Sequence, residues 1–389
     1  MNKKYLIELI KSVILSKQPP EKPNEVSFEE IFKISKKHHI TNMIYYAIVK
    51  LKNKPDEKLL KLWKQEYSIS IMRDIVQKEE FSVLKNVFNE NAIKHIPLKG
   101  FELKKLYPKS DMRDMSDLDI LIQNKDREKV KKLLEKLNYT TEKYGKGKDD
   151  IYYKKPIMNI EIHNTLFEES NKKMNSYFLS LSKMERCIKE QEYLYIFSKE
   201  DFLIYGISHI AKHFKGAGTG IKSVIDWYLY SKKNFENIDW NYVNSSLEEL
   251  NLNKFYQTLI DLGKVWFEEK SHTDLTKNFE EHIFNSGAYG NINDRILNNL
   301  AKNNNKISLV DRIRTLKKMT FPTYLVMCEQ YPILKTRKKL LYLYYIKRIF
   351  EIIFFRRKNK LKIIKTIFSE DKSTISKRKQ FYKDIGLEK

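Results

Sequence analysis

The first 90 residues of the chain carry apolar positions at the spacing of α-helices. In segments 28–34 and 43–49 the apolar residues recur every three or four positions, which places them on one side of a helix. Residues 59–88 extend this pattern far enough to predict one long amphipathic helix. The polar Asn89-Glu90-Asn91 ends the pattern. The sequence therefore predicts a helical N-terminal region over residues 1–90.

From about residue 92 the pattern changes to short apolar runs separated by turns. These runs predict strands at 95–98, 117–122, 151–153 and 158–163. Helical spacing predicts short helices at 101–106 and 126–137. A few strands covered by helices make an α+β fold, here a small mixed β-sheet. We expect this core to occupy residues 91–170.

Helical spacing returns after Phe167. Helices are predicted over 202–214 and 221–230, and further helices fill the remainder of the chain. The glycine-rich segment 215–220 joins the first two. Because it follows a helix and lacks the Gly-Lys-Ser/Thr ending of a P-loop, we interpret it as a helix–helix loop. We divide this part of the chain into a helical domain, 171–300, and a basic helical C-terminal region, 301–389.

Composition indicates the compartment in which the protein works and shows an uneven distribution of charge along the chain. Two distant cysteines, Cys187 and Cys328, exclude a disulfide framework or a cysteine-rich zinc site and favour the cytoplasm. We expect neither a signal peptide nor a membrane-spanning helix. The formal net charge is +24, and residues 301–389 hold 24 Lys and Arg against 7 Asp and Glu. This excess predicts contact with a polyanion, either RNA or an anionic membrane at its inner face; a solvated basic surface is the alternative.

Two acids alternate with apolar residues in the strand predicted at 117–122. Asp117 and Asp119 therefore share one face, and the apolar residues between and after them point the other way. Adjacent carboxylates repel and are buried only where a cation neutralises them. Mg²⁺ (or Mn²⁺) does so through oxygen ligands and also holds phosphate groups. Glu161 is the candidate third carboxylate, and His163 shares its face on a later strand.

The residues before this strand suit phosphate binding. Gly100 opens a predicted helix, where backbone N–H groups bind phosphate and glycine lets it approach closely. Lys99 adds a positive charge, and the planar fork of Arg113 matches phosphate oxygens. The alternatives are a plain strand-to-helix turn for Lys99 and Gly100 and a surface position for Arg113.

Two histidines, His209 and His213, lie four residues apart and share one face of a predicted helix. Ile210 stands where zinc proteases place a glutamate, so a zinc protease site is excluded. We expect the pair to contact an acceptor substrate or to support the site. His163 has the same two candidate roles.

Together these motifs resemble the uncharacterised nucleotidyltransferase family of the polymerase β-like nucleotidyltransferase superfamily. The resemblance spans about residues 93–230. The matching elements are Leu98-Lys99-Gly100, Arg113, Asp117-Leu118-Asp119-Ile120-Leu121, Glu161-Ile162-His163, and the segment 208–213 followed by Asp226. It implies a transferase that moves a nucleoside monophosphate from an NTP such as ATP to an acceptor and releases pyrophosphate. It further implies that Asp117, Asp119 and Glu161 bind the catalytic metal, with Lys99, Gly100 and Arg113 on the nucleotide.

Two other functions fit parts of the sequence. A glycosyltransferase could use Asp117-Leu118-Asp119 to hold a metal–nucleotide-sugar complex, but it needs a large parallel α/β domain ahead of that motif. A non-catalytic basic binding module could retain a transferase scaffold, but the intact acids argue against it. Residues 340–355, followed by a basic run at 356–362, predict an amphipathic helix for a membrane or RNA, or else a buried helix of a C-terminal bundle.

Overall fold

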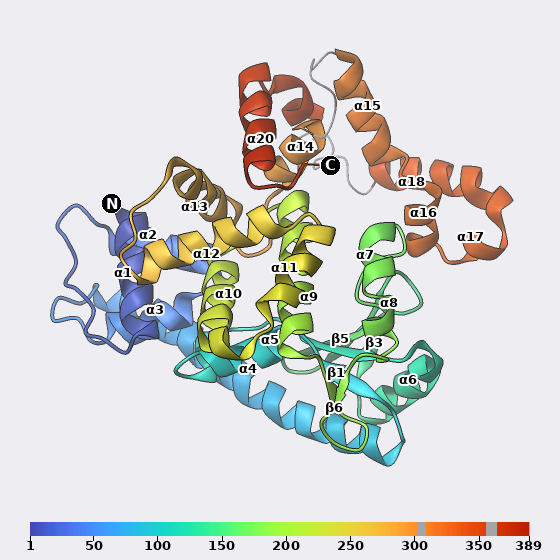
Figure 1. The fold of residues 1–389 in the computed structure, drawn as a ribbon, viewed down its shortest axis with the longest axis horizontal. Helices are drawn as coiled ribbons and strands as arrows, with labels where there is room; N and C mark the ends of the chain where they lie inside the picture. The colour runs from blue at the N-terminus through green and yellow to red at the C-terminus, as the bar shows by residue number, and fades with distance from the viewer. Residues whose placement is uncertain (302–308, 355–363, 389) are drawn as a thin grey trace.

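The computed structural model describes residues 1–301, 309–354 and 364–388. It confirms the predicted α+β class, because a small mixed sheet lies among many helices (Figure 1). The basic run at 356–362 lies outside the described residues. Within the described ranges, no helix has both the length and the apolar character needed to cross a membrane.

Four helices form the N-terminal region. The long helix predicted over 59–88 is confirmed, and it begins slightly earlier because the Asp56 carboxylate accepts a hydrogen bond from the Leu59 N–H at 2.9 Å. The helices are α1 (Asn2–Ile14), α2 (Phe28–Lys37), α3 (Thr41–Ile48) and α4 (Glu57–Glu90).

The central region forms a five-stranded sheet in the order β1-β2-β5-β4-β3. β2 and β5 are parallel, and the other neighbouring pairs are antiparallel. Its elements are β1 (His95–Pro97), α5 (Gly100–Leu103), β2 (Leu118–Ile122), α6 (Arg127–Lys136), β3 (Thr140–Lys143), β4 (Asp149–Lys154) and β5 (Met158–His163). The strand predicted from residue 117 thus begins at Leu118, and the helix predicted over 101–106 is a short α-helix followed by a 3₁₀ turn.

The two faces of this sheet differ in chemistry. Alternate residues of β2 and β5 pack against α4 and α6, which cover the apolar face (Figure 1). Asp119, Glu161 and His163 are among the remaining residues of the same strands and therefore occupy the opposite face. Helices from the second half of the chain lie over that polar face.

These covering helices share one apolar core with the N-terminal helices. Leu6, Trp63, Phe214 and Tyr382 all belong to it, so segments from both ends of the chain meet there. The helical region contains α7 (Lys172–Tyr177), α8 (Leu179–Ser182), a small hairpin of β6 (Ile188–Lys189) and β7 (Tyr195–Ile196), α9 (Lys199–Gly216), α10 (Ile221–Lys233), α11 (Trp240–Glu249), α12 (Asn253–Phe267) and α13 (Asp274–Ser286).

In the C-terminal region the described residues form helices and no strand. Its described helices are α14 (Ile292–Ala301), α15 (Leu309–Thr320), α16 (Tyr324–Gln330), α17 (Ile333–Thr336), α18 (Leu341–Phe354) and α20 (Lys372–Asp384). Two small apolar clusters hold them together. The proposed domain boundaries near residues 90, 170 and 300 stay predictions.

Candidate functional site

The parallel pairing of β2 and β5 brings two of the predicted acids together. The register places Asp119 directly opposite Glu161, and Leu121 opposite His163. Because both strands alternate, the carboxylates of Asp119 and Glu161 leave the sheet on the same face. Adjacent acids on neighbouring strands are unfavourable without a neutralising group.

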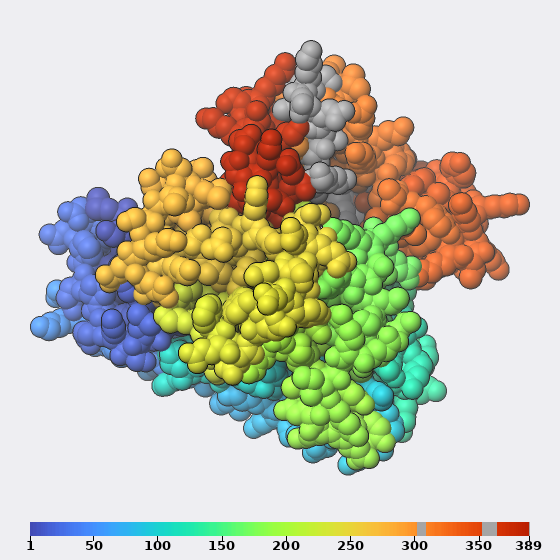
Figure 2. Space-filling model, viewed as in Figure 1, coloured from blue at the N-terminus to red at the C-terminus, as the bar shows by residue number. Residues whose placement is uncertain are grey.

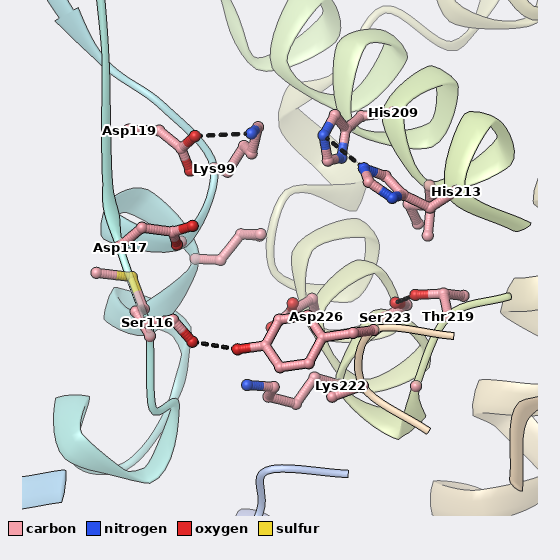
Figure 3. Close-up of a pocket in the computed structure, with 18 of the residues that line it drawn as sticks. Lys99, Ser116, Asp117, Asp119, His209, His213, Thr219, Lys222, Ser223 and Asp226 are labelled. Atoms are coloured by element: carbon pink, nitrogen blue, oxygen red, sulfur yellow. Dashed lines mark hydrogen bonds and ion pairs between the residues drawn. The ribbon is translucent and has the colours of Figure 1, made fainter. Parts of the chain in front are cut away.

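Asp117 lies just before β2 and joins this group at the wall of a cavity. The cavity has a volume of about 530 Å³, and Asp117, Asp119 and Glu161 all line it. Figure 3 shows Asp117, Asp119 and Lys99 on one wall and residues of α9 and α10 on the other. The site therefore lies between the polar face of the sheet and the helical region.

One carboxylate oxygen of Asp119 accepts two hydrogen bonds, and one of the donors is a cation. Its Oδ1 accepts from Lys99 Nζ at 2.8 Å and from His163 Nε2 at 2.6 Å. No described residue hydrogen-bonds to Oδ2. Burial favours the protonated acid, but Lys99 and His163 outweigh it and hold the pKa of Asp119 well below its usual range.

A lysine fixes the tautomer of His163. Lys148 Nζ lies 3.0 Å from His163 Nδ1, and an ammonium can only donate. Nδ1 therefore accepts, and Nε2 carries the proton donated to Asp119. Burial and the Lys148 charge lower the pKa of His163 to about 4, which agrees with a neutral ring.

The other two acids lack such partners. Among the described residues, neither Asp117 nor Glu161 forms a side-chain hydrogen bond with another residue. Glu161 Oε2 lies 3.6 Å from Nε2 of the neutral His163 ring. Burial, followed by repulsion from Asp119, raises the pKa of Asp117 to about 6. The same two causes raise the pKa of Glu161 to about 7.

These donors suit a divalent cation. Candidate ligand atoms of Asp119, Glu161 and His163 lie within 4.8 Å of one another. Both ring nitrogens of His163 are already engaged by Asp119 and Lys148, so the two carboxylates are the available ligands. Asp117 adds a further carboxylate to the same wall of the cavity. Carboxylate oxygens with raised pKa values are ligands that Mg²⁺ or Mn²⁺ would stabilise in the charged form.

The backbone at Lys99 is strained. Its φ is +45° and its ψ is −109°, a conformation that residues with a Cβ rarely adopt. Strain of this kind costs on the order of 1–3 kcal/mol and concentrates at functional sites. Here the turn directs the Lys99 ammonium to Asp119 as the chain passes from β1 into α5.

The space beside Gly100 is filled by protein. A Cβ at Gly100 would lie 2.4 Å from Met115 Sδ and 2.6 Å from Arg113 Nη1. Glycine therefore lets the side chains of Met115 and Arg113 lie against the start of α5, and a larger residue would displace them. The predicted contact of Gly100 with phosphate stays a prediction.

Arg113 is held by Asp226 of α10. Its Nε and Nη2 donate to the two carboxylate oxygens at 2.7 Å each, and Tyr107 donates to Oδ1 at 2.7 Å. The side chain lines the cavity while bridging the β-sheet region to the helical region. Arg113 is thus a cavity residue with an internal partner, and its role towards phosphate stays a prediction.

His209 and His213 lie on α9 and line the cavity wall facing Lys99 and Asp119 (Figure 3). Their Nε2 atoms are 3.2 Å apart, so one ring donates to the other. Burial, followed by nearby cations, lowers the pKa of both, to about 4 for His213. Two neutral imidazoles therefore lie across the cavity from the acids.

This constellation agrees with a comparison against known protein families. The sequence profile of the family described as uncharacterised nucleotidyltransferase matches residues 24–268. The chain belongs to that family. No curated protein and no solved structure matches the chain. Membership supports nucleotidyl transfer as the general reaction and a nucleotide as a substrate.

In this member of the family, tertiary contacts also bring cations to the cavity that no motif indicated. Among the described lining residues, four cations have a carboxylate partner: Lys99 with Asp119, Arg113 with Asp226, Lys148 with Asp149, and Lys212 with Glu168. The exception is Lys222, whose Nζ donates to the Asp114 carbonyl at 2.8 Å. Burial, followed by Arg113, lowers the pKa of Lys222 to about 8.

Lys222 follows the glycine-rich segment, which the structure confirms as the connection between α9 and α10. Gly218, Thr219 and Gly220 also line the cavity. Across it, the Tyr289 hydroxyl hydrogen-bonds Ser116 beside the acids (Figure 3). The only feature of the sequence that could have placed Lys222 at the site is its position just after the glycine-rich segment. No feature of the sequence indicated Tyr289.

A second cavity of about 540 Å³ adjoins the first. The two share Lys148, Asp149 and Glu168 among their lining residues. Its outer wall includes Tyr331 and Lys347 of the C-terminal region. The candidate site thus adjoins residues beyond the matched family segment.

Proposed function

We propose that this protein is a metal-dependent nucleotidyltransferase that moves a nucleoside monophosphate from an NTP to an acceptor hydroxyl and releases pyrophosphate. The observation that carries the proposal is the register of β2 and β5. It sets Asp119 beside Glu161, with Asp117 at the entry of the same strand, on the wall of a cavity large enough for a small ligand.

Asp117, Asp119 and Glu161 would hold Mg²⁺ or Mn²⁺. Two of these acids have raised pKa values and lack a cation partner, and Asp119 keeps Oδ2 without a hydrogen bond from any described residue. When bound, the metal lowers the pKa of the attacking hydroxyl and neutralises charge on the phosphates. His163 orients Asp119 through its Nε2 hydrogen bond.

The transfer step is a displacement at the α-phosphorus. The acceptor oxygen forms a bond to that phosphorus, and the bond from phosphorus to the oxygen bridging the α- and β-phosphates breaks. Pyrophosphate leaves with that oxygen, and Glu161 takes the hydroxyl proton. A carboxylate placed beside the attacking hydroxyl can take its proton as a general base.

The cations of the cavity would bind the triphosphate. Lys99 lies beside Asp119, and Arg113 extends Nη1 over Gly100. Lys222 approaches from the opposite wall and has no carboxylate partner among the described residues, so it is the cation with most to gain from a phosphate. We assign Lys99, Gly100, Arg113 and Lys222 to the nucleotide.

The neutral imidazoles of His209 and His213 face the acids and would contact the acceptor. A glycosyltransferase is not favoured, because the described residues ahead of Asp117 form helices and one three-residue strand rather than a parallel α/β domain.

The test is incubation of the full-length protein with each α-labelled NTP, Mg²⁺ or Mn²⁺ and a metabolite extract. We expect pyrophosphate and a labelled product that disappear with a chelator and with Asp119→Asn. Asp261→Asn, remote from the cavity, is the matched control and should retain activity. If no NTP gives pyrophosphate, or Asp119→Asn is as active as the wild type, the proposal is wrong.

A further inference from the structure

The C-terminal region concentrates the exposed apolar side chains of the molecule. Eleven large apolar residues in the described parts of the chain are at least 50% exposed, and seven of these lie between residues 309 and 350. They are Leu309, Val310, Ile313, Tyr342, Leu343, Ile346 and Phe350. Contiguous exposed apolar surface on a globular protein marks an interaction site.

The outer stripe of α18 is the most continuous part of this surface. Tyr342, Leu343 and Ile346 are 77%, 61% and 51% exposed. Ile346 lies four residues after Tyr342 and three after Leu343, so the three residues border one face of the helix. Tyr344 and Tyr345 face inward and pack against the Met327 cluster. The helix is thus held on one side and presents an apolar stripe on the other. In Figure 2 the residues of α15–α18 form an orange lobe at the edge of the molecule.

Basic residues surround the stripe. Arg337, Lys338 and Lys339 are exposed immediately before α18, and Lys347 is exposed within it. Residues 301–389 carry 24 basic and 7 acidic side chains. A partner for this surface must therefore offer negative charge and an apolar phase together.

We propose that α18 docks this protein on an anionic membrane surface, with Tyr342, Leu343 and Ile346 entering the lipid interface. An amphipathic helix with aromatic and aliphatic residues on one face and lysines beside it binds such surfaces by apolar burial and charge. A second copy of the chain would bring two strongly basic regions together. RNA offers charge and stacking, but no environment for Leu343 and Ile346.

Docking in this manner places the second cavity near the lipid. Lys347 and Glu351 of α18 line that cavity, next to the stripe on the same helix. The docking itself does not depend on the proposed transferase activity, so each can fail without the other.

The test is co-sedimentation of the full-length protein with two kinds of vesicle. One is phosphatidylcholine alone, and in the other about a third of the lipid is phosphatidylglycerol. We expect binding to the anionic vesicles that weakens as salt rises. The variant Leu343→Ser/Ile346→Ser keeps every charge and should bind at least about tenfold more weakly, because it removes two apolar side chains from the interface.

Ile188→Ser/Phe235→Ser is the matched control, since both residues are exposed but lie outside the C-terminal region. It should bind as the wild type does, and thermal melting should show both variants folded. Absence of binding to anionic vesicles at low salt overturns the proposal. So does equal binding by the α18 variant and the wild type, or binding of RNA in preference to the anionic vesicles.

Discussion

At the scale of single residues, the three acids of the site differ in what neutralises them. Asp119 has Lys99 and His163 within hydrogen-bonding distance, whereas Asp117 and Glu161 have no such partner among the described residues. Loss of a paired charge and loss of a repelled charge have opposite effects on stability. The acids can therefore be separated by experiment even though they share one cavity.

Asp117→Asn should leave the metal-free protein as stable as the wild type or slightly more stable, because it removes a repelled carboxylate. Asp119→Asn should lower the free energy of unfolding by about 1–3 kcal/mol, because it leaves the ammonium of Lys99, a largely buried side chain that is 17% exposed, without its partner. Denaturant unfolding in the presence of a chelator measures both. Equal stability changes in the two variants would contradict the charge arrangement described above. Calorimetry should show that each variant loses Mg²⁺-dependent NTP binding.

Glu161→Gln should affect turnover more than nucleotide binding. In the proposed step its carboxylate serves the attacking hydroxyl, so removing the base should lower kcat on the order of a hundredfold while the NTP Kd changes little. Glu192→Gln, in an exposed loop, is the control. A variant that loses NTP affinity but keeps its rate at saturation would show that the role given to Glu161 is wrong.

Lys222 should bind phosphate only while it is charged. Its free-protein pKa of about 8 means that the ammonium is present below this pH and is lost as pH rises through it. We expect kcat/KM of the wild type for the NTP to fall above about pH 8. In Lys222→Arg, kcat/KM should not fall over this pH range, since arginine stays charged. Lys222→Gln should raise KM on the order of tenfold to a hundredfold. Lys232→Gln, on the same helix but paired with Glu268, is the control. A KM unchanged in Lys222→Gln would remove this residue from the nucleotide site.

At the scale of elements, alternation and helical spacing predict what pairs locally. They predict β2, β5 and α6, because each presents an apolar face to one side and polar residues to the other. They do not predict β3, whose Thr-Thr-Glu-Lys sequence is largely exposed at the edge of the sheet. Neither do they predict that Lys148, Lys222 and Tyr289 reach the cavity, since each arrives through contacts between elements distant in sequence.

The crossing of α9 and α10 holds the far wall of the site. At Gly206 a Cβ would lie 1.8 Å from two ring carbons of Trp227, so the two helices meet without room for a side chain. Trp227 is buried in the main core. Gly206→Ala should therefore lower the free energy of unfolding by about 1–3 kcal/mol or more. Adding Trp227→Leu should recover part of the loss in a double-mutant cycle. If Gly206→Ala alone were as stable as the wild type, the two helices would have to separate easily at this crossing.

At the scale of the whole molecule, the ends of the chain belong to one core. Tyr382, Ile385 and Leu387 are buried in the same cluster as the N-terminal helices and α9. The Tyr382 hydroxyl also donates to the Phe214 carbonyl at 2.8 Å. The end of the basic C-terminal region is therefore part of the main core, and the proposed docking must be tested by surface substitutions in α18 rather than by truncation.

Deleting residues 381–389 should accordingly destabilise the whole protein, although these residues lie at the end of the chain and far from the acids in sequence. Three buried apolar side chains are lost, and each contributes about 1.5–3 kcal/mol, so we expect the free energy of unfolding to fall by about 4 kcal/mol or more. The exposed stripe of α18 contributes no such burial, so Leu343→Ser/Ile346→Ser should melt within a few degrees of the wild type. Thermal and denaturant unfolding of the three proteins side by side measures the difference. A truncated protein as stable as the wild type would mean that the C-terminal end does not belong to the core, and deletion would then become a valid way to isolate the membrane-docking surface.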